Sequence, residues 1–278
     1  TPILKAHKEY PVTESEKPKS RRWVPTELEL AFHLYCQLPF GKLHNRNKDI
    51  IALAHILGRT PSSIALKLVN FSSLDPSITS TGRSGMKNAS TADRQIWAEF
   101  NNDWEGMALK CATLYEHART THHLPAEETT PELSENQEAL QNYQGASRMA
   151  MTEQRVKQNF FRRAVLSSYN EKCCITGISD TRLLVASHIV PWSKDTQNRL
   201  NPRNGLSLSC LHDKAFDRGL ITISDQYEVT LSREIKCSKD EYIALSFHRF
   251  EGKPITLPQR FYPAQEFLEK HRVETFKG

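Results

Sequence analysis

The stretch CCITGISDTRLLVASHIVPWSKDTQNRLNPRNGLSLSCLHDKAFDRGLITI, residues 173–223, decides the fold of the C-terminal half of the chain. Within it, the apolar and β-branched run 183–190 predicts a strand, which a proline stops. After a polar loop, the alternating run 205–209 predicts a second strand. Residues 211–218 then predict a short helix, and Gly219 is well placed to end it. The stretch therefore predicts a strand, a loop, a second strand and a helix, in that order.

Polar side chains gather at the ends of these predicted elements. His188 lies near the end of the first strand, Asn204 opens the second strand, and His212 and Asp213 fall in the first turn of the helix. An imidazole with an ordinary pKa near about 6.5 suits general-base chemistry at neutral pH. A carboxylate beside an imidazole suits a hard or borderline divalent cation. Because these short elements must pack together, the stretch predicts a single polar site.

The same residues, in the same order, resemble the HNH (ββα-metal) endonuclease motif. The segments that carry the resemblance are Ser187-His188-Ile189, Pro191-Trp192, Asn204-Gly205-Leu206, His212-Asp213 and Phe216-Asp217-Arg218-Gly219. The resemblance implies that His188 removes a proton from water, and that Asn204 holds either the loop backbone or the imidazole. It also implies a divalent metal ion, Mg²⁺ or Mn²⁺, with His212 or Asp213 as its ligand on the helix.

The helix ligand stays open between two residues. The family usually places it nine residues after Asn204, which is Asp213, and Asp213 shares a helix face with Asp217. Relatives with an H-D-x-x-F-D segment are instead read with the histidine, here His212. Ser187 stands where many HNH enzymes carry an acidic or histidine ligand. Three alternatives follow for the metal ion. It is held by fewer protein ligands and more water, or Asp213 or Asp217 replaces the missing ligand, or the site binds the metal more weakly.

The chain as a whole is predicted to be an α+β protein in three parts. Residues 23–120 carry helical patterns and would form a DNA-recognition domain. One of these helices begins near Thr91 and is expected to extend irregularly to His117. Residues 121–150 lack a sustained apolar face and are predicted to be a linker. Residues 151–278 would then form the HNH nuclease domain.

A helix-turn-helix unit is predicted near the middle of the helical domain. A helix over 48–57, a short turn that contains Gly58, and a helix over 61–70 have the spacing of such a unit. Thr60 would cap the second helix. We expect that helix to bury Leu66 with its other apolar residues and to occupy the recognition position. The side chains that we expect to contact DNA are Arg59, Thr60, Ser62, Ser63, Lys67 and Arg203.

Composition limits the classes of protein that fit. The net charge of +5 and a pI of about 8.8 fit a partner that is a polyanion. No apolar run approaches the roughly 20 residues that cross a bilayer, so no membrane partner is expected. The six cysteines include no CxxC pair, which argues against a structural zinc site. Unpaired cysteines are typical of a reduced, cytoplasmic protein.

These observations together predict a metal-dependent endonuclease acting on double-stranded DNA at a specific or modified site, as in bacterial restriction. One motif cuts one strand, so a double-strand break would favour a homodimer. The alternative, from another class, is a non-catalytic DNA-binding protein with a degenerate HNH fold, and Ser187 is its best support. A third alternative, an RNA substrate, is disfavoured by the helix-turn-helix pattern.

Overall fold

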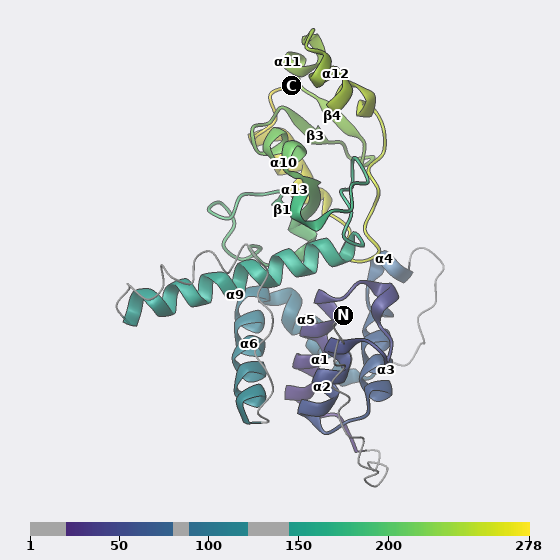
Figure 1. Ribbon diagram of the computed structural model, residues 1–278, viewed down its shortest axis with the longest axis vertical. Helices are drawn as coiled ribbons and strands as arrows, with labels where there is room; N and C mark the ends of the chain where they lie inside the picture. Colours follow the sequence, from purple (N-terminus) through teal and green to yellow (C-terminus); the bar gives the residue numbers. More distant parts are fainter. Residues whose placement is uncertain (1–20, 80–88, 122–144) are drawn as a thin grey trace, which may run out of the picture.

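The computed structural model of the protein describes residues 21–79, 89–121 and 145–278, without the side chains of residues 145–149. A long helix, α9 (Gly145–Ser168), crosses the middle of the molecule. Figure 1 shows the N-terminal helices on one side of α9 and all the strands on the other. The helix therefore lies between the two parts of the fold.

The N-terminal part is built from helices that surround a central one, α1 (Pro25–Gln37), whose buried side chains include Phe32 and Tyr35. The helices that pack on α1 are α2 (Lys48–Leu57), α3 (Pro61–Ser72), α5 (Thr91–Asn102), α6 (Trp104–Thr121) and α9. Two short segments, η1 (Phe40–Lys42) and α4 (Pro76–Thr79), complete this part.

The predicted pair of helices with a short turn is present. Helix α2 has the predicted bounds and ends at Gly58, whose φ of 58° is the left-handed conformation that glycine adopts easily. Thr60 caps α3 by accepting a hydrogen bond from the Ser63 amide at 3.2 Å. The prediction for Leu66 is wrong, because its side chain is 48% exposed. A helix turns about 100° per residue, so Leu66 cannot share the inward face of Ile64.

The predicted helix from Thr91 to His117 is two helices. Helix α5 begins after Ser90, whose side chain caps the amide of Asp93, and it ends at Asp103. Asp103 has φ −146° and ψ 80°, which is outside the helical region, and α6 starts at the next residue. The break redirects the chain, so that both helices pack on α1.

Helix α9 begins inside the segment that the sequence predicted to be a linker. The predicted linker 121–150 is helical at both ends, at Thr121 in α6 and over residues 145–150 in α9, and residues 122–144 lie outside the described ranges. Phe160 and Phe161 of α9 are each 2% exposed, and they pack against different parts of the fold. Phe160 packs against His33 of α1, whereas Phe161 packs against a residue of the C-terminal part.

The C-terminal part has the predicted order of strand, loop, strand and helix. Strand β1 (Leu184–His188) pairs antiparallel with β2 (Gly205–Ser209), and α10 (Cys210–Asp217) packs across both strands. The remaining elements are η2 (Thr181–Leu183), η3 (Pro202–Asn204), β3 (Ile221–Ile223), β4 (Val229–Leu231), α11 (Arg233–Cys237), α12 (Glu241–Ser246), η4 (His248–Phe250) and α13 (Gln265–Glu274). Strands β3 and β4 form a second antiparallel pair.

A buried arginine from the C-terminal part contacts the N-terminal helices. Arg260 is 0% exposed, and its guanidinium donates to the carbonyl of Tyr35 at the C-terminal end of α1. It also donates to the carbonyl of Cys36 at 3.3 Å and to the Ser167 hydroxyl at 3.1 Å. The two parts therefore share one hydrophobic core and are also joined by the hydrogen bonds of Arg260. Among the described helices, none has both the length and the apolar character needed to span a bilayer.

The folded protein is expected to lose stability in mild acid through His271 of α13. Its ring stacks on Phe216, with centroids 3.7 Å apart, and its two nitrogens hydrogen-bond the Thr222 hydroxyl and the Phe216 carbonyl. Burial is the main cause that lowers the pKa of His271 to about 4, from an ordinary 6.5. Between pH 4 and pH 6.5, His271 is therefore protonated in the unfolded chain and neutral in the folded chain. The resulting stability is full above pH 6.5 and is lost as the pH falls towards 4.

The loss from this one group is on the order of 3 kcal/mol. Urea unfolding at pH 7 and at pH 4.5 measures it, because a His271→Met variant should show a smaller drop between the two pH values than the wild type. The exposed His44 is the matched control, and its His44→Met variant should keep the wild-type drop. An equal drop in all three proteins would contradict the prediction.

Candidate active site

His188 lies at the end of β1, where it packs against α9. Its ring lies flat on Phe161 of α9, with centroids 3.8 Å apart and an angle of 7°, and Trp192 meets its edge at 5.6 Å. Gly205 pairs opposite His188 in β2. A Cβ there would lie 2.3 Å from Val165 and 3.0 Å from Phe161, so only glycine lets α9 approach this closely.

The hydrogen bonding of His188 leaves one ring nitrogen as a base. Its Nε2 lies 2.9 Å from the carbonyl oxygen of Arg199, and a carbonyl can only accept, so Nε2 carries the proton. The neutral ring then presents Nδ1 as an acceptor. Burial lowers the pKa of His188, and the hydrogen bond to Arg199 opposes that shift. The imidazole is therefore neutral at pH 7 and able to take up a proton.

Asn204 fixes the loop that follows His188. It is 0% exposed, and its side-chain oxygen accepts from the Val190 amide at 2.8 Å. Its side-chain nitrogen donates to the carbonyls of Val190 at 3.1 Å and Asn198 at 3.2 Å. Of the two predicted alternatives for Asn204, the structure has the contact with the loop backbone. The loop in turn carries Arg199, whose carbonyl orients His188.

His212, the first of the two predicted helix ligands, has protein partners on both ring nitrogens, which favours Asp213. It is 3% exposed, and its Nδ1 lies 2.9 Å from the Ser209 hydroxyl. Its Nε2 lies 3.1 Å from the Ser246 carbonyl. Its ring packs between Phe247 and Phe250. Both nitrogens are engaged within the protein, so His212 stabilises the packing of α10 against the segment that follows α12.

Asp213 and Asp217 lie one turn apart on α10, and Asp213 lies beside Ser187 of β1. Burial raises the pKa of Asp213, and the nearby Ser187 hydroxyl and Lys214 lower it. Burial and the negative charge of Asp213 raise the pKa of Asp217. Ser187 is 2% exposed, and its oxygen makes no hydrogen bond of normal geometry. The donor set is therefore two carboxylates and one buried hydroxyl.

These oxygen donors fit a hard divalent cation. A cation would relieve both the burial and the mutual repulsion of the Asp213 and Asp217 carboxylates. Over the described ranges, no group of three or more His, Cys, Asp or Glu side chains is arranged for a metal ion. Mg²⁺ is commonly held by one or two carboxylates and several waters, so the smaller set suffices.

Arg59 is engaged inside the N-terminal part, contrary to the expectation that it faces DNA. Its side chain is 6% exposed and pairs with Glu27 at 2.7 Å. It also donates to the carbonyls of Arg21 and Arg22 and lies over the ring of Trp23, 4.0 Å from its centroid. These contacts hold the segment before α1 against the turn between α2 and α3.

Lys67 is likewise internal, contrary to the expectation that it contacts DNA. It is 7% exposed, and its ammonium contacts both carboxylate oxygens of Asp93 at 2.8 and 3.1 Å. The remaining four expected DNA contacts stay predictions. Of these, Thr60, Ser62 and Arg203 are exposed and Ser63 is half-buried.

The sequence did not reveal the platform beneath His188. Phe161 precedes the stretch 173–223 that predicts the site, and its stacking on the imidazole depends on how α9 crosses the strands. The role of Arg199 was also missed, because it acts through its backbone carbonyl. A backbone contact leaves no signal in the type of residue.

A strand pair crossed by a helix, with a neutral histidine at the strand end and carboxylates on the helix, is a ββα arrangement. Residues 173–224 match the HNH_2 family model, which is described as HNH endonuclease. The match begins at Cys173, covers the whole strand, loop, strand and helix unit, and ends just after β3. This part of the chain is therefore an HNH-type domain. A search of curated proteins found no match.

Proposed function

We propose that the protein is a metal-dependent endonuclease that hydrolyses phosphodiester bonds in double-stranded DNA. The observation that carries the proposal is His188, whose protonated Nε2 is held by a backbone carbonyl and whose Nδ1 is left as a base. The match of residues 173–224 to HNH endonucleases supports the same reading.

In the proposed reaction, His188 Nδ1 takes a proton from the attacking water. Asn204 keeps the loop and the Arg199 carbonyl in place, so that the imidazole holds its tautomer. Asp213 and Asp217, with Ser187 beside them, would hold Mg²⁺ or Mn²⁺. When bound, such an ion neutralises charge on the phosphate and assists the leaving oxygen. The products would carry 5′-phosphate and 3′-hydroxyl ends.

The N-terminal helices would provide target recognition, as in a restriction enzyme that reads a specific or modified site. Thr60, Ser62 and Ser63 at the start of α3 support this proposal, because Thr60 and Ser62 are exposed and Ser63 is half-buried, and hydroxyl side chains at a helix start can contact phosphates. A chain with one HNH-type site would nick one strand, so a double-strand break would require a homodimer.

The experiment that tests the proposal is cleavage of supercoiled plasmid in Mg²⁺, in Mn²⁺ and in EDTA. Parallel reactions use unmodified and methylated plasmid. Cleavage in either metal that EDTA abolishes is the expected result, and the preferred plasmid would report what the N-terminal part reads. Absence of cleavage on every plasmid, with a retained gel shift, would instead favour the non-catalytic DNA-binding protein, whose structural support is Ser187 at a ligand position.

The two candidate helix ligands give separable outcomes. Asp213→Asn removes a carboxylate charge from the proposed cation site, so the Mg²⁺ concentration for half-maximal cleavage should rise about 10- to 100-fold. His212→Gln leaves those carboxylates in place and should lower the unfolding temperature without changing that concentration. A metal titration of plasmid cleavage measures both. The reverse pattern, with the metal requirement changed only in the His212 variant, would restore His212 as the ligand.

A further inference from the structure

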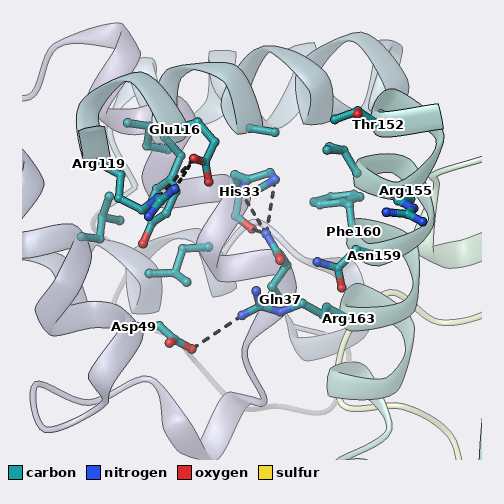
Figure 2. A pocket seen from close by; sticks show the side chains of 16 residues that line it. His33, Gln37, Asp49, Glu116, Arg119, Thr152, Arg155, Asn159, Phe160 and Arg163 are labelled. Carbon is teal, nitrogen blue, oxygen red and sulfur yellow. Dashed lines mark hydrogen bonds and ion pairs between the residues drawn. The ribbon is translucent and has the colours of Figure 1, made fainter. Parts of the chain in front are cut away.

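A cavity of about 370 Å³ lies between α1, α2, α6 and α9, apart from the HNH-type site. Figure 2 shows its lining residues, which come from α1, α2 and α6 and from the face of α9 that carries Phe160. Cavities of a few hundred Å³ are large enough to hold small organic ligands. The nature of the ligand can be argued from the lining.

One wall of the cavity is flat and aromatic. Phe160 stacks on His33, with ring centroids 5.0 Å apart and an angle of 18°. Tyr115 also lines the cavity, together with apolar side chains such as Leu34 and Val156. Burial and the charge of Arg163 lower the pKa of His33 to about 3, so its ring is neutral at pH 7. A flat, uncharged wall of this kind suits a planar ring.

Two amide side chains enter the same space. Gln37 is 8% exposed, and its nitrogen lies 3.0 Å from His33 Nδ1 and 3.1 Å from the His33 carbonyl oxygen. Its oxygen accepts no hydrogen bond from any described residue and is the group that it offers to a ligand. Asn159 is half-buried, and within the described ranges its amide has no hydrogen-bond partner. Figure 2 shows Asn159 extending from α9 towards Gln37 on α1. Together they offer both donors and acceptors, which is the pattern that pairs with the edge of a nucleobase.

Among the described residues that line the cavity, guanidinium groups outnumber carboxylates. Three guanidinium groups, those of Arg119, Arg155 and Arg163, stand against the carboxylates of Asp49 and Glu116. Arg163 lies 3.6 Å from Asp49 and Arg119 lies 2.7 Å from Glu116. Guanidinium groups beside an apolar wall favour a ligand that joins a planar ring to an anion such as phosphate.

We propose that this cavity binds one nucleotide unit. The base would lie against the wall formed by Phe160 and His33, with its edge on Gln37 and Asn159, and the phosphate would face the arginines. The unit could come from a free mononucleotide or from a nucleotide turned out of a DNA strand. The proposal does not rest on DNA cleavage, because binding is measured directly.

The first test is calorimetric titration of the full chain with each of the four deoxynucleoside monophosphates and with inorganic phosphate. Asn159→Leu removes the amide at nearly constant volume. Gln158→Leu is the matched control, because Gln158 is exposed on the same helix and does not line the cavity. We expect at least one nucleotide to bind the wild type and the control alike, and Asn159→Leu at least about tenfold more weakly.

A second arm distinguishes the source of the nucleotide. It compares a matched DNA duplex with a duplex that contains one unpaired nucleotide. The nucleotide comes from DNA if the wild type binds the duplex with the unpaired nucleotide more tightly than the matched duplex. Asn159→Leu should then lose this preference, and Gln158→Leu should keep it. A variant that fills the cavity, Ala112→Phe, should abolish binding in whichever arm is positive. Equal behaviour of all variants in both arms, or binding of phosphate as tight as that of the nucleotides, would overturn the proposal.

Discussion

Replacing His188 with alanine is expected to reduce plasmid cleavage by about 10²- to 10⁴-fold, because the proposed reaction loses its base. The imidazole is the neutral acceptor at the end of β1, with Nε2 held by the Arg199 carbonyl at 2.9 Å. Its removal leaves the carboxylates on α10 in place, so the dependence on metal ions should survive in the residual activity. A single-turnover nicking assay at saturating Mg²⁺ measures the change.

The controls separate a chemical effect from a structural one. Removing the ring exposes the face of Phe161 on which it stacks, so the alanine variant needs unfolding and gel-shift measurements beside the cleavage assay. His188→Gln is a second variant, since its amide can still donate to the Arg199 carbonyl but is a very weak base. His44→Ala, at an exposed histidine, should cleave like the wild type. Undiminished cleavage by folded His188→Ala and His188→Gln proteins would refute the base role.

The elements that the sequence predicted well are those whose causes are local. The bounds of α2 follow from neighbouring signals, a cap at Asn47 and a left-handed Gly58, each within one turn of the helix it limits. The unit of β1, β2 and α10 was also predictable, because alternation, Pro191 and Gly219 all act on adjacent residues. His188 and Asn204 were found through that unit, since their spacing is fixed by the same short elements.

The corrections to the predicted site residues concern partners that are distant in the sequence. Arg59 pairs with Glu27, and Lys67 pairs with Asp93, 32 and 26 residues away. No local pattern distinguishes these cations from others that remain exposed. The Nε2 of His212 is engaged by the Ser246 carbonyl, which lies 34 residues further on. Tertiary packing therefore decided which polar residues are free, although local sequence decided which elements they occupy.

Helix α9 explains why the site cannot be read from the matched stretch alone. Phe161 supports His188, and Arg162 donates to the carbonyl of Leu184 at the start of β1 at 2.8 Å. Both residues precede the part of the chain that matches the HNH endonuclease model, which begins at residue 173. The same helix packs on α1 and α6, so the N-terminal helices contribute to the position of the histidine.

Replacing Arg260 with alanine is expected to lower the free energy of unfolding by about 3–5 kcal/mol, the largest stability effect that we predict. The guanidinium is 0% exposed and donates to the carbonyls of Tyr35 and Cys36 and to the Ser167 hydroxyl. The two carbonyls belong to the last turn of α1, where a cation is favourable. Without the guanidinium, these buried acceptors lose their donor, and a cavity opens beside Tyr35.

Urea unfolding followed by tryptophan fluorescence and by circular dichroism measures this effect. Arg182→Ala is the matched control, because its side chain is 86% exposed, and it should unfold like the wild type. Arg260 joins the ends of α1 and α9 to the C-terminal segment, so its loss should also separate the unfolding of the N-terminal helices from that of the strands. Two transitions, or one at a clearly lower urea midpoint, would agree with this role. A single transition at the wild-type midpoint would show that the apolar packing around α9 holds the two parts together without the arginine.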